Sequence, residues 1–395
     1  MKLNKNNFLD IFSTNLKSYE DYFIATYEIK TNPQKGDVLQ ASYELAIGQS
    51  IGNPYSRSIH EESSLITNNS CIILHDPNEL ENKYEMIINI AFPNINIDFQ
   101  NDGISQLLCM LMGGQMDIET FEKCRLVDIK FSKNIERFFY KPVYGLSGMR
   151  NKVNSYDKPL FGSIIKPKTG INKIKLLDMV KQLIDGGVDF IKEDEILSNP
   201  HFCSLKERVP LITNYLEKNN IKIIYTFCIN SDHDEIINRS RFIVNEGGHG
   251  IHINWWAGLG VYRSIKKLNL PLFIHFQKSG DKVITHENHN FGIDWKVICS
   301  IAALSGVDSI HVGMLGGYLN DDETKLKKIS IDLSKKNTIP ALSCGLNSKS
   351  IPVINKAIGT DYLANVGGAV HSNPEGSTKG AKLMRDTIDQ YTNIK

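Results

Sequence analysis

The segment GGVDFIKEDE, residues 186–195, joins an apolar run that favours a β-strand to four consecutive charged residues. Side chains two apart on a strand share a face, so Lys192 and Asp194 point the same way. Glu195 can turn toward them if the strand ends there. A lysine beside two carboxylates is an unusual metal site because an ammonium repels a cation, and conversion of the lysine to an acid would remove this conflict. The alternative is a solvated charge run, the more common role of such a sequence.

Further reactive residue types lie at or near the ends of other apolar runs. Taken singly they have ordinary roles: strand histidines are mostly structural, glycines form turns, cysteines pack as small apolar side chains and lysines are solvated. The residues are Lys166, Lys168, His275, His311, Ser343, Cys344, Gly345, Gly367 and Gly368. They would form one site if the runs were strands whose ends meet.

The alternation of apolar runs and amphipathic segments after Pro159 would bring these residues together. Eight runs are predicted strands, at residues 160–168, 188–195, 221–229, 250–256, 270–277, 308–315, 339–345 and 361–368. Predicted helices lie at 174–184, 205–217, 235–244, 295–304, 323–333 and 379–391. This order favours a parallel (β/α)₈ TIM barrel, whose active site lies where the strands end. An open doubly wound sheet is the alternative, because strand order is not visible in a sequence.

Two glycine-containing strand ends in this arrangement suit a phosphate group. Residues 343–345 end the seventh predicted strand, and residues 367–368 end the eighth. Bare backbone N–H groups at this position of a barrel bind phosphate. Lys166 or Lys168 could then neutralise a negative charge that develops on a substrate oxygen.

The first 145 residues follow a different order of elements. Predicted strands at 23–30, 71–75, 84–92 and 126–131 interleave with predicted helices at 39–48 and 104–112. The order βαββαβ is typical of a ferredoxin-like α+β domain, a fold that hosts many functions. We therefore predict two domains, a ferredoxin-like domain at 1–145 and the barrel at 146–395, with Gly145 to Tyr156 as the link between them.

One residue of the first domain, Glu44, is a candidate for function. It lies in the first predicted helix, just before the polar, glycine-containing segment at 47–53. A glutamate on a helix is ordinarily solvated, but a loop of this composition could reach a ligand. The residues alone leave both interpretations open.

The composition argues against several classes of function. Lys and Arg number 45 against 44 for Asp and Glu, and a formal net charge of +1 gives no field to attract nucleic acid or a membrane surface. The seven cysteines are scattered without a CxxC pair, so a zinc or redox motif is unsupported and a cytoplasmic location is expected. We see no signal peptide, and no stretch approaches the ~20 apolar residues of a membrane span.

Five segments together resemble the RuBisCO large-subunit superfamily, in the family's order and on its strands. They are IIKPKTG (164–170), GGVDFIKEDE (186–195), IHVG (310–313), SCG (343–345) and VGG (366–368). The resemblance implies that CO₂ carbamylates Lys192, which with Asp194 and Glu195 then binds Mg²⁺. It also implies that Lys166 is an acid or base beside the reacting carbon.

The resemblance extends to residues around the substrate and to assembly. By position, His275 and His311 match histidines near the substrate. SCG and VGG are among the matching segments, and with Lys168 they are the predicted substrate- and phosphate-binding residues. Glu44 matches a residue that the family contributes to the active site of the neighbouring subunit, which implies a homodimer. No nucleic acid or membrane partner is expected.

The departures from the family pattern bear on the reaction. Tyr318 stands where carboxylases carry the lysine that stabilises the carboxylated intermediate, and Phe276 stands where an arginine grips a second phosphate. Gln49, Ser50 and Gly114 also replace family residues near the substrate, namely a threonine, a tryptophan and an asparagine. The chain is thus similar to the RuBisCO-like proteins called form IV, which implies a singly phosphorylated substrate and no CO₂ fixation.

The leading expectation is a Mg²⁺-dependent enzyme that enolises, decarboxylates or isomerises a phosphorylated keto compound derived from a sugar. The preferred side is a decarboxylase or hydrolase, and a 2,3-diketo-5-methylthiopentyl-1-phosphate enolase of methionine salvage is an alternative. A ribulose-bisphosphate carboxylase would need another cation in place of the loop lysine, such as Lys278. A non-catalytic sugar-phosphate-binding protein is the remaining alternative, disfavoured because a pure binder gains little from a carbamate.

Overall fold

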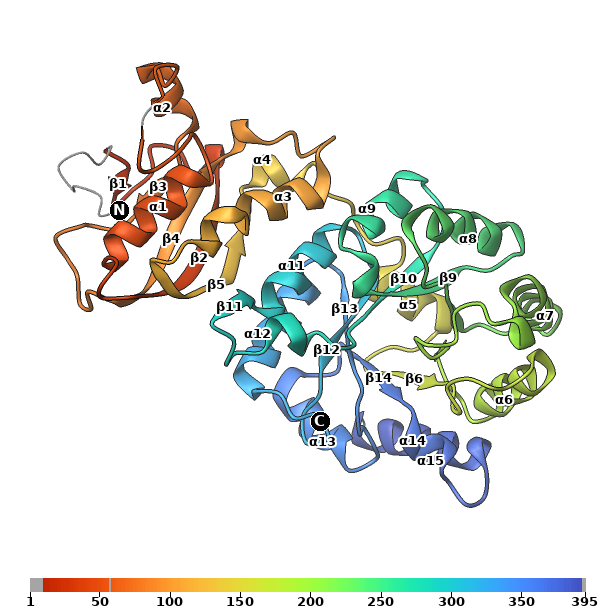
Figure 1. Cartoon of the computed structure of the whole chain (residues 1–395). Coiled ribbons are helices and arrows are strands. Elements are labelled where there is room, and N and C mark those ends of the chain that lie inside the picture. Colours follow the sequence, from red (N-terminus) through yellow and green to blue (C-terminus); the bar gives the residue numbers. More distant parts are fainter. Residues whose placement is uncertain (1–9, 57, 393–395) are drawn as a thin grey trace. The chain divides into compact units, whose positions relative to one another are not determined.

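The structure is a computed structural model that describes residues 10–56 and 58–392 and divides into two compact units (Figure 1). The first unit contains the chain up to Phe139 together with the segment Gly280–Ile301. The second contains Tyr140–Ser279 and the chain from Ala302 onward. The predicted domain limits at residues 145 and 146 stay predictions.

The first unit is built on a mixed sheet with the strand order β1-β3-β4-β2-β5-β11. Its strands are β1 (Phe12–Ser13), β2 (Tyr22–Thr31), β3 (Ile72–Leu74), β4 (Glu85–Pro93), β5 (Phe121–Lys130) and β11 (Phe291–Ile293). Strands β2 to β5 pair antiparallel in the ferredoxin-like order, which confirms the predicted fold. Alternate side chains of β2 are buried, as expected when one face of a sheet carries the core.

The segment Gly280–Ile301 is tied to this sheet by long-range contacts. The helices of the unit are α1 (Val38–Gly48), α2 (Ser63–Asn69), α3 (Gly103–Leu111), α4 (Lys133–Glu136) and α10 (Lys282–Thr285). β11 pairs in parallel with β5. The buried guanidinium of Arg125 donates to the carbonyls of Thr285, His286 and His289, at 3.1, 2.8 and 3.0 Å. These bonds explain why Gly280–Ile301 belongs with the first unit.

The second unit is a closed parallel barrel with the strand order β10-β12-β13-β14-β6-β7-β8-β9. Its strands are β6 (Leu160–Ile164), β7 (Phe190–Lys192), β8 (Ile224–Cys228), β9 (Gly250–Asn254), β10 (Phe273–Gln277), β12 (Ser309–Gly313), β13 (Ile339–Leu342) and β14 (Leu363–Val366). Parallel pairing of β14 with β6 belongs to this closed ring. The barrel is therefore confirmed, and the open sheet is excluded.

Helices surround these strands in Figure 1, in the alternation that the sequence predicts. They are α5 (Gly145–Val153), α6 (Lys173–Asp185), α7 (Leu205–Lys218), α8 (His233–Asn245), α9 (Gly260–Lys267), α12 (Glu323–Lys335), α13 (Ser350–Ile358), α14 (Gly368–His371) and α15 (Ser377–Thr392). The helix α11 (Trp295–Leu304) begins in the segment assigned to the first unit and ends in the second. The strands β8, β9, β10 and β12 are buried along their whole length, as the inner wall of a barrel requires.

The predicted link from Gly145 to Tyr156 is wrong, because most of it forms the helix α5. Met149 of this helix is fully buried in a cluster with strand residues that include Leu160, Phe190 and Phe273. Gly145 begins the helix at φ +57°, a conformation that glycine adopts without strain. Its N–H donates to the Asp308 carboxylate at 2.9 Å. The segment is thus part of the barrel core.

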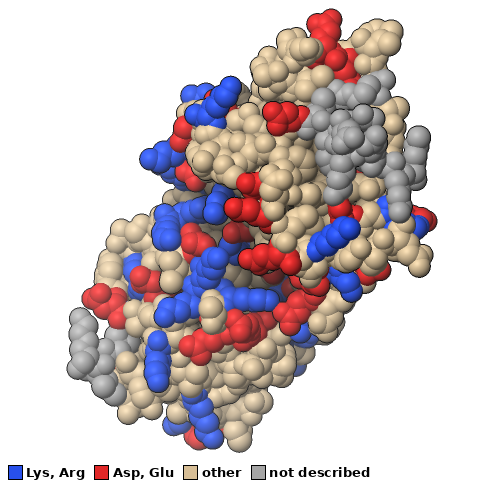
Figure 2. Space-filling model, turned by 90° about the vertical axis from the view of Figure 1, so that its left-hand side faces the viewer, with Lys and Arg blue, Asp and Glu red and all other residues tan. Residues whose placement is uncertain are grey.

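One face of the molecule shows charges of both signs. On the face shown in Figure 2, groups of basic side chains lie directly beside groups of acidic ones. With a formal net charge of +1, such a surface gives no extended field for a polyanion. In the described part of the chain, no helix combines the length and apolar character needed to cross a membrane.

Candidate active site

Two lysines and two carboxylates meet at the ends of β6 and β7. Lys192 is the last residue of β7, and its side chain is only 1 % exposed. Its Nζ donates to Oε2 of Glu195 at 3.1 Å. Asp194, also 1 % exposed, accepts a hydrogen bond from Nζ of Lys166 at 2.5 Å. The structure thus brings these four predicted residues together.

Glu193 belongs to the same charged run but has a different set of partners. Its carboxylate forms a two-point ion pair with Arg208 of α7, at 2.7 and 2.8 Å, and both side chains are fully buried. The same carboxylate accepts hydrogen bonds from the N–H of Cys228 at 2.8 Å and the hydroxyl of Tyr225 at 3.1 Å. Since these donors satisfy it, Glu193 fixes β7 against β8 and α7.

Glu195 is kept ionised by the groups around it. Burial alone would raise the pKa of its carboxyl, but the Lys192 ammonium, followed by the backbone N–H of Glu195 and then the Ser279 hydroxyl, outweighs burial and lowers this pKa to about 2. The Ser279 hydroxyl donates to Oε1 at 2.9 Å, and Asn230 Nδ2 donates to the backbone carbonyl at 2.6 Å. The carboxylate is therefore charged and held in one orientation, as a cation ligand requires.

His275 on β10 and His311 on β12 are buried beneath this site as neutral rings. Nε2 of His275 lies 3.2 Å from Oε1 of Gln277. His311 contacts the Lys278 carbonyl through Nδ1 at 3.2 Å and the Ser343 hydroxyl through Nε2 at 2.9 Å. Burial, and then the nearby lysine ammoniums, lower the pKa of both histidines, that of His311 to about 3.

A cavity of about 420 Å³ opens at the strand ends and collects most of the predicted residues. Those that line it are Lys166, Lys168, Asp194, Glu195, Ser343, Cys344, Gly345, Gly367 and Gly368. Lys192, His275 and His311 lie below it in the barrel interior and are not among its lining residues. Gln277 and Ser279, which the sequence reasoning missed, also line it. Their place directly at the end of β10 was the available signal.

Glu44 lies in the first unit, on α1, with its side chain fully buried. Gln40 Nε2 donates to its Oε1 at 2.8 Å. Burial, and then the Glu44 carboxylate, raise the pKa of the Tyr55 phenol to about 12. Glu44 thus has partners within its own unit, and its role toward a neighbouring subunit stays a prediction.

Comparison with known families assigns this barrel. Residues 145–393 match the catalytic domain of the ribulose bisphosphate carboxylase large chain. The chain belongs to the RuBisCO large-chain family. Because the match covers the barrel and its strand ends, it applies to the unit that carries the lysines and carboxylates described above.

Relatives within the family carry different names. Ribulose bisphosphate carboxylase of Pyrococcus furiosus is 28 % identical over 316 residues, which cover 77 % of this chain and 74 % of the relative. The 3-oxo-isoapionate-4-phosphate decarboxylase of Rhizobium rhizogenes is 29 % identical over 312 residues, 75 % of this chain and 73 % of the relative. A RuBisCO-like protein of Archaeoglobus fulgidus is 26 % identical over 331 residues, 78 % and 73 % of the two chains. These identities do not separate carboxylase from decarboxylase.

Solved structures agree on the fold of this RuBisCO-family chain. Octameric Rubisco from Pyrococcus horikoshii OT3 superposes with a TM-score of 0.84 at 24 % identity, covering 97 % of this chain and 91 % of that chain. A rubisco-like protein from Burkholderia fungorum gives a TM-score of 0.80 at 23 % identity and covers 94 % of both chains. The barrel with an N-terminal mixed-sheet domain is therefore the RuBisCO fold.

The loop after β12 holds Tyr318 at the edge of the cavity of about 420 Å³. A Cβ on Gly317 would lie 2.3 Å from the carbonyl oxygen of Cys344, so the loop packs directly on the end of β13. Tyr318 lines the cavity with its side chain largely exposed. Lys278 also lines the cavity, and its Nζ lies 3.9 Å from Oδ1 of Asp321 in the same loop.

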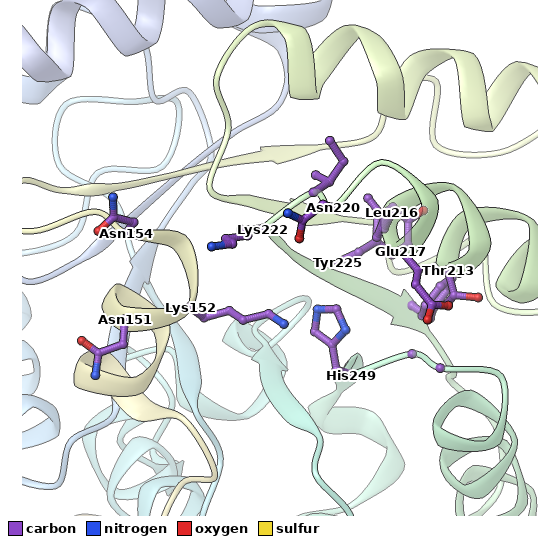
Figure 3. A pocket seen from close by; sticks show the side chains of 14 residues that line it. Asn151, Lys152, Asn154, Thr213, Leu216, Glu217, Asn220, Lys222, Tyr225 and His249 are labelled. Atoms are coloured by element: carbon purple, nitrogen blue, oxygen red, sulfur yellow. The ribbon is translucent and has the colours of Figure 1, made fainter.

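A larger cavity, of about 920 Å³, lies at the opposite end of the barrel, where β8 and β9 begin (Figure 3). Lys152 of α5 extends toward the His249 ring, and Lys222 and Glu217 also line this space. The pairs Lys166–Asp194 and Lys192–Glu195 are not among the residues that line this larger cavity. Since the N-terminal end of such barrels contributes stability, we place the chemistry at the smaller cavity.

Proposed function

We propose that this chain is a Mg²⁺-dependent RuBisCO-like enzyme that forms an enolate from a singly phosphorylated keto compound. Decarboxylation or isomerisation is the expected reaction, without CO₂ fixation. The observation that carries the proposal is the pairing of Lys166 with Asp194 and of Lys192 with Glu195 beside a cavity of about 420 Å³.

The residues present fit a magnesium ion once Lys192 is carbamylated. No group of three or more His, Cys, Asp or Glu side chains in the described residues could hold a metal by itself. A carbamate on Lys192 would add the missing anionic oxygen beside Asp194 and Glu195, and hard oxygens are the ligands that Mg²⁺ prefers. The bound ion would act as a Lewis acid that stabilises negative charge on the substrate oxygen.

Lys166 is the residue placed to move a proton. Its Nζ lies in the cavity and is held by Asp194 at 2.5 Å. A lysine in such a position can act as an acid or base toward the carbon next to a carbonyl. Lys168 lines the same wall and adds positive charge for the anionic substrate.

Bare glycine backbone at the ends of β13 and β14 suits the phosphate. Gly345 has φ +100°, a conformation favoured by glycine, and lines the cavity together with Gly367 and Gly368. A Cβ at Gly368 would meet no atom within 4 Å, so space is open in front of this backbone. Backbone N–H groups at these strand ends would hold one phosphate, next to the end of β6 that carries Lys166.

Two substitutions support a reaction other than carboxylation. Phe276 is fully buried and packs on Tyr262 with ring centroids 4.8 Å apart, so this position offers no group to bind a second phosphate. Tyr318 provides a phenol rather than an ammonium at the rim. A relative at 29 % identity is named a decarboxylase of a phosphorylated oxo-acid, which is the substrate class we favour.

The test is turnover of a panel of phosphorylated oxo-acids and ketones by the Mg²⁺- and CO₂-activated protein. We expect release of CO₂ or exchange of deuterium into at least one compound, and methylthio-sugar phosphates in the panel would reveal a methionine-salvage enolase. Lys192→Ala should abolish metal-dependent activity while circular dichroism and thermal melting show a folded protein. Normal activity in this variant would refute the carbamate, and no reaction across the panel would favour a non-catalytic binding protein.

Carboxylation is the second candidate, because Lys278 gives the cavity a further ammonium. Relatives named ribulose bisphosphate carboxylase are also as similar as the decarboxylase. Labelled CO₂ with ribulose bisphosphate separates the two proposals. Clear incorporation into 3-phosphoglycerate, lost in Lys278→Gln, would establish carboxylation, whereas no incorporation supports the enolate chemistry proposed above.

A further inference from the structure

Two adjacent tryptophans after β9 share one hydrogen-bond acceptor. Trp255 is buried and Trp256 is 55 % exposed, and their ring centroids lie 4.6 Å apart. The indole Nε1 of Trp255 donates to the carbonyl of Ser279 at 3.0 Å, and that of Trp256 donates to the same oxygen at 2.9 Å. A carbonyl oxygen has two lone pairs, so the two indoles saturate it and fix the backbone after β10.

The hydroxyl of Ser279 connects this backbone to the charged site. Nε2 of Gln277 donates to Ser279 Oγ at 3.1 Å, so the hydroxyl accepts there. Its single hydrogen is then directed to Oε1 of Glu195, 2.9 Å away. The indoles thus determine where the hydroxyl lies, and Gln277 determines which way its hydrogen points.

Glu195 is consequently fixed through both carboxylate oxygens. Oε1 accepts from Ser279, and Oε2 accepts from Lys192 at 3.1 Å. If a carbamate replaces the Lys192 ammonium, the Lys192 donor is lost and Ser279 is left to orient the carboxylate. Groups that orient a metal ligand in this way typically change metal affinity by about 10–100-fold when removed.

We propose that Trp255, Trp256 and Ser279 are positioning residues that hold Glu195 in the orientation needed to bind Mg²⁺. The proposal rests on the metal site proposed above and deepens it. None of the three touches the cation in this scheme, since they act through the carboxylate. A consequence is that the fluorescence of the two indoles should respond to cation binding at Glu195, because Ser279 contacts both the Glu195 carboxylate and the two indole N–H groups.

The experiment is a Mg²⁺ titration of the full chain in bicarbonate, followed by calorimetry and by tryptophan fluorescence. The third tryptophan, Trp295, lies in the other unit, so the titrations use a Trp295→Phe background in which only the paired indoles remain. We expect Mg²⁺ to change the fluorescence with the same midpoint that calorimetry gives. Ser279→Ala should weaken Mg²⁺ binding by about 10–100-fold, and Ser279→Thr, which keeps the hydroxyl, should restore most of the affinity.

The outcomes separate this inference from the proposed function. Absence of Mg²⁺ binding to the parent protein by calorimetry would overturn both. Binding of equal strength in the parent and in Ser279→Ala would overturn the positioning role and leave the metal site standing. Equal loss in the Ala and Thr variants, with lowered melting temperatures in both, would show a merely structural serine and likewise overturn the inference.

Discussion

Neighbouring carboxylates of one short segment have different tasks because different groups surround them. Glu193 is enclosed by a guanidinium, a hydroxyl and a backbone N–H, whereas Glu195 has an ammonium and a hydroxyl at the edge of the cavity. The period of a strand predicted that Lys192 and Asp194 share a face, but β7 ends at Lys192, and the partner of Lys192 is Glu195 while that of Asp194 is Lys166. The strand period could not predict that Arg208 binds Glu193 or that Ser279 binds Glu195, because these partners come from other elements, which only the closed barrel brings close.

Replacement of Arg208 by Ala should strongly destabilise the barrel. The change leaves the fully buried Glu193 carboxylate without its cation, and breaking a buried pair in this way typically costs about 3–5 kcal/mol. Urea unfolding followed by circular dichroism measures the loss. Lys173→Ala is the matched control, since it removes the ammonium of the solvent-exposed Lys173–Glu207 pair and should leave the unfolding midpoint unchanged. Coinciding curves for Arg208→Ala and the parent would contradict the structural role of Glu193.

At the scale of elements, the alternation of apolar runs located the strands well, but it missed α5. The segment of α5 has little apolar character apart from Leu146, Met149 and Val153, and it begins on a glycine. Its helical state depends on contacts that a sequence does not show: Met149 in the barrel core and the Asp308 carboxylate at its start. The conformation of the loop after β12 also depends on a contact that the sequence does not show, namely the close packing of Gly317 on the backbone of Cys344.

Met149→Ala tests whether α5 is part of the barrel core. The side chain is fully buried among strand residues, and truncation of such a methionine costs about 2–5 kcal/mol. The expected result is a lower urea midpoint with unchanged Mg²⁺ affinity. Met149 packs against the first residues of the barrel strands, whereas the proposed cation site lies at the opposite ends of these strands. Lys152→Ala is the control, because Lys152 lies in the same helix and lines the larger cavity of about 920 Å³, and this variant should retain the urea midpoint of the parent. A parent-like midpoint for Met149→Ala would show that α5 packs loosely.

At the scale of the whole molecule, the sequence predicted both folds and the family, but not how the chain divides between the units. Eight regular alternations of strand and helix favoured a barrel over an open sheet, and the closed strand order of the structure decided between the two. The transfer of Gly280–Ile301 to the first unit rests on a three-residue strand, β11, and on the Arg125 guanidinium. Both are long-range pairings with no local signal, since each joins residues more than a hundred positions apart.

The stability of the whole fold should fall as the pH is lowered below neutrality. His252, His275 and His311 are buried in the barrel, and burial, followed by nearby ammoniums, lowers the pKa of each. An unfolded histidine binds a proton near pH 6.5, whereas the folded one stays neutral until much lower, about 3 for His311. The unfolded state therefore gains protons first, and stability that is complete above pH 6.5 is lost progressively below it.

Each histidine whose folded ring stays neutral contributes a slope of up to about 1.4 kcal/mol per pH unit once the pH is below 6.5. Asp308 opposes one of them, because burial raises the pKa of its carboxyl to about 6 and its protonation in the folded state adds stability as the pH falls. Urea unfolding at half-unit intervals from pH 7.5 to 5 measures the net slope. His252→Gln should reduce it by about one histidine's share, while His60→Gln, at an exposed position, should not. A flat profile for the parent protein would mean that the buried rings are protonated in the folded state.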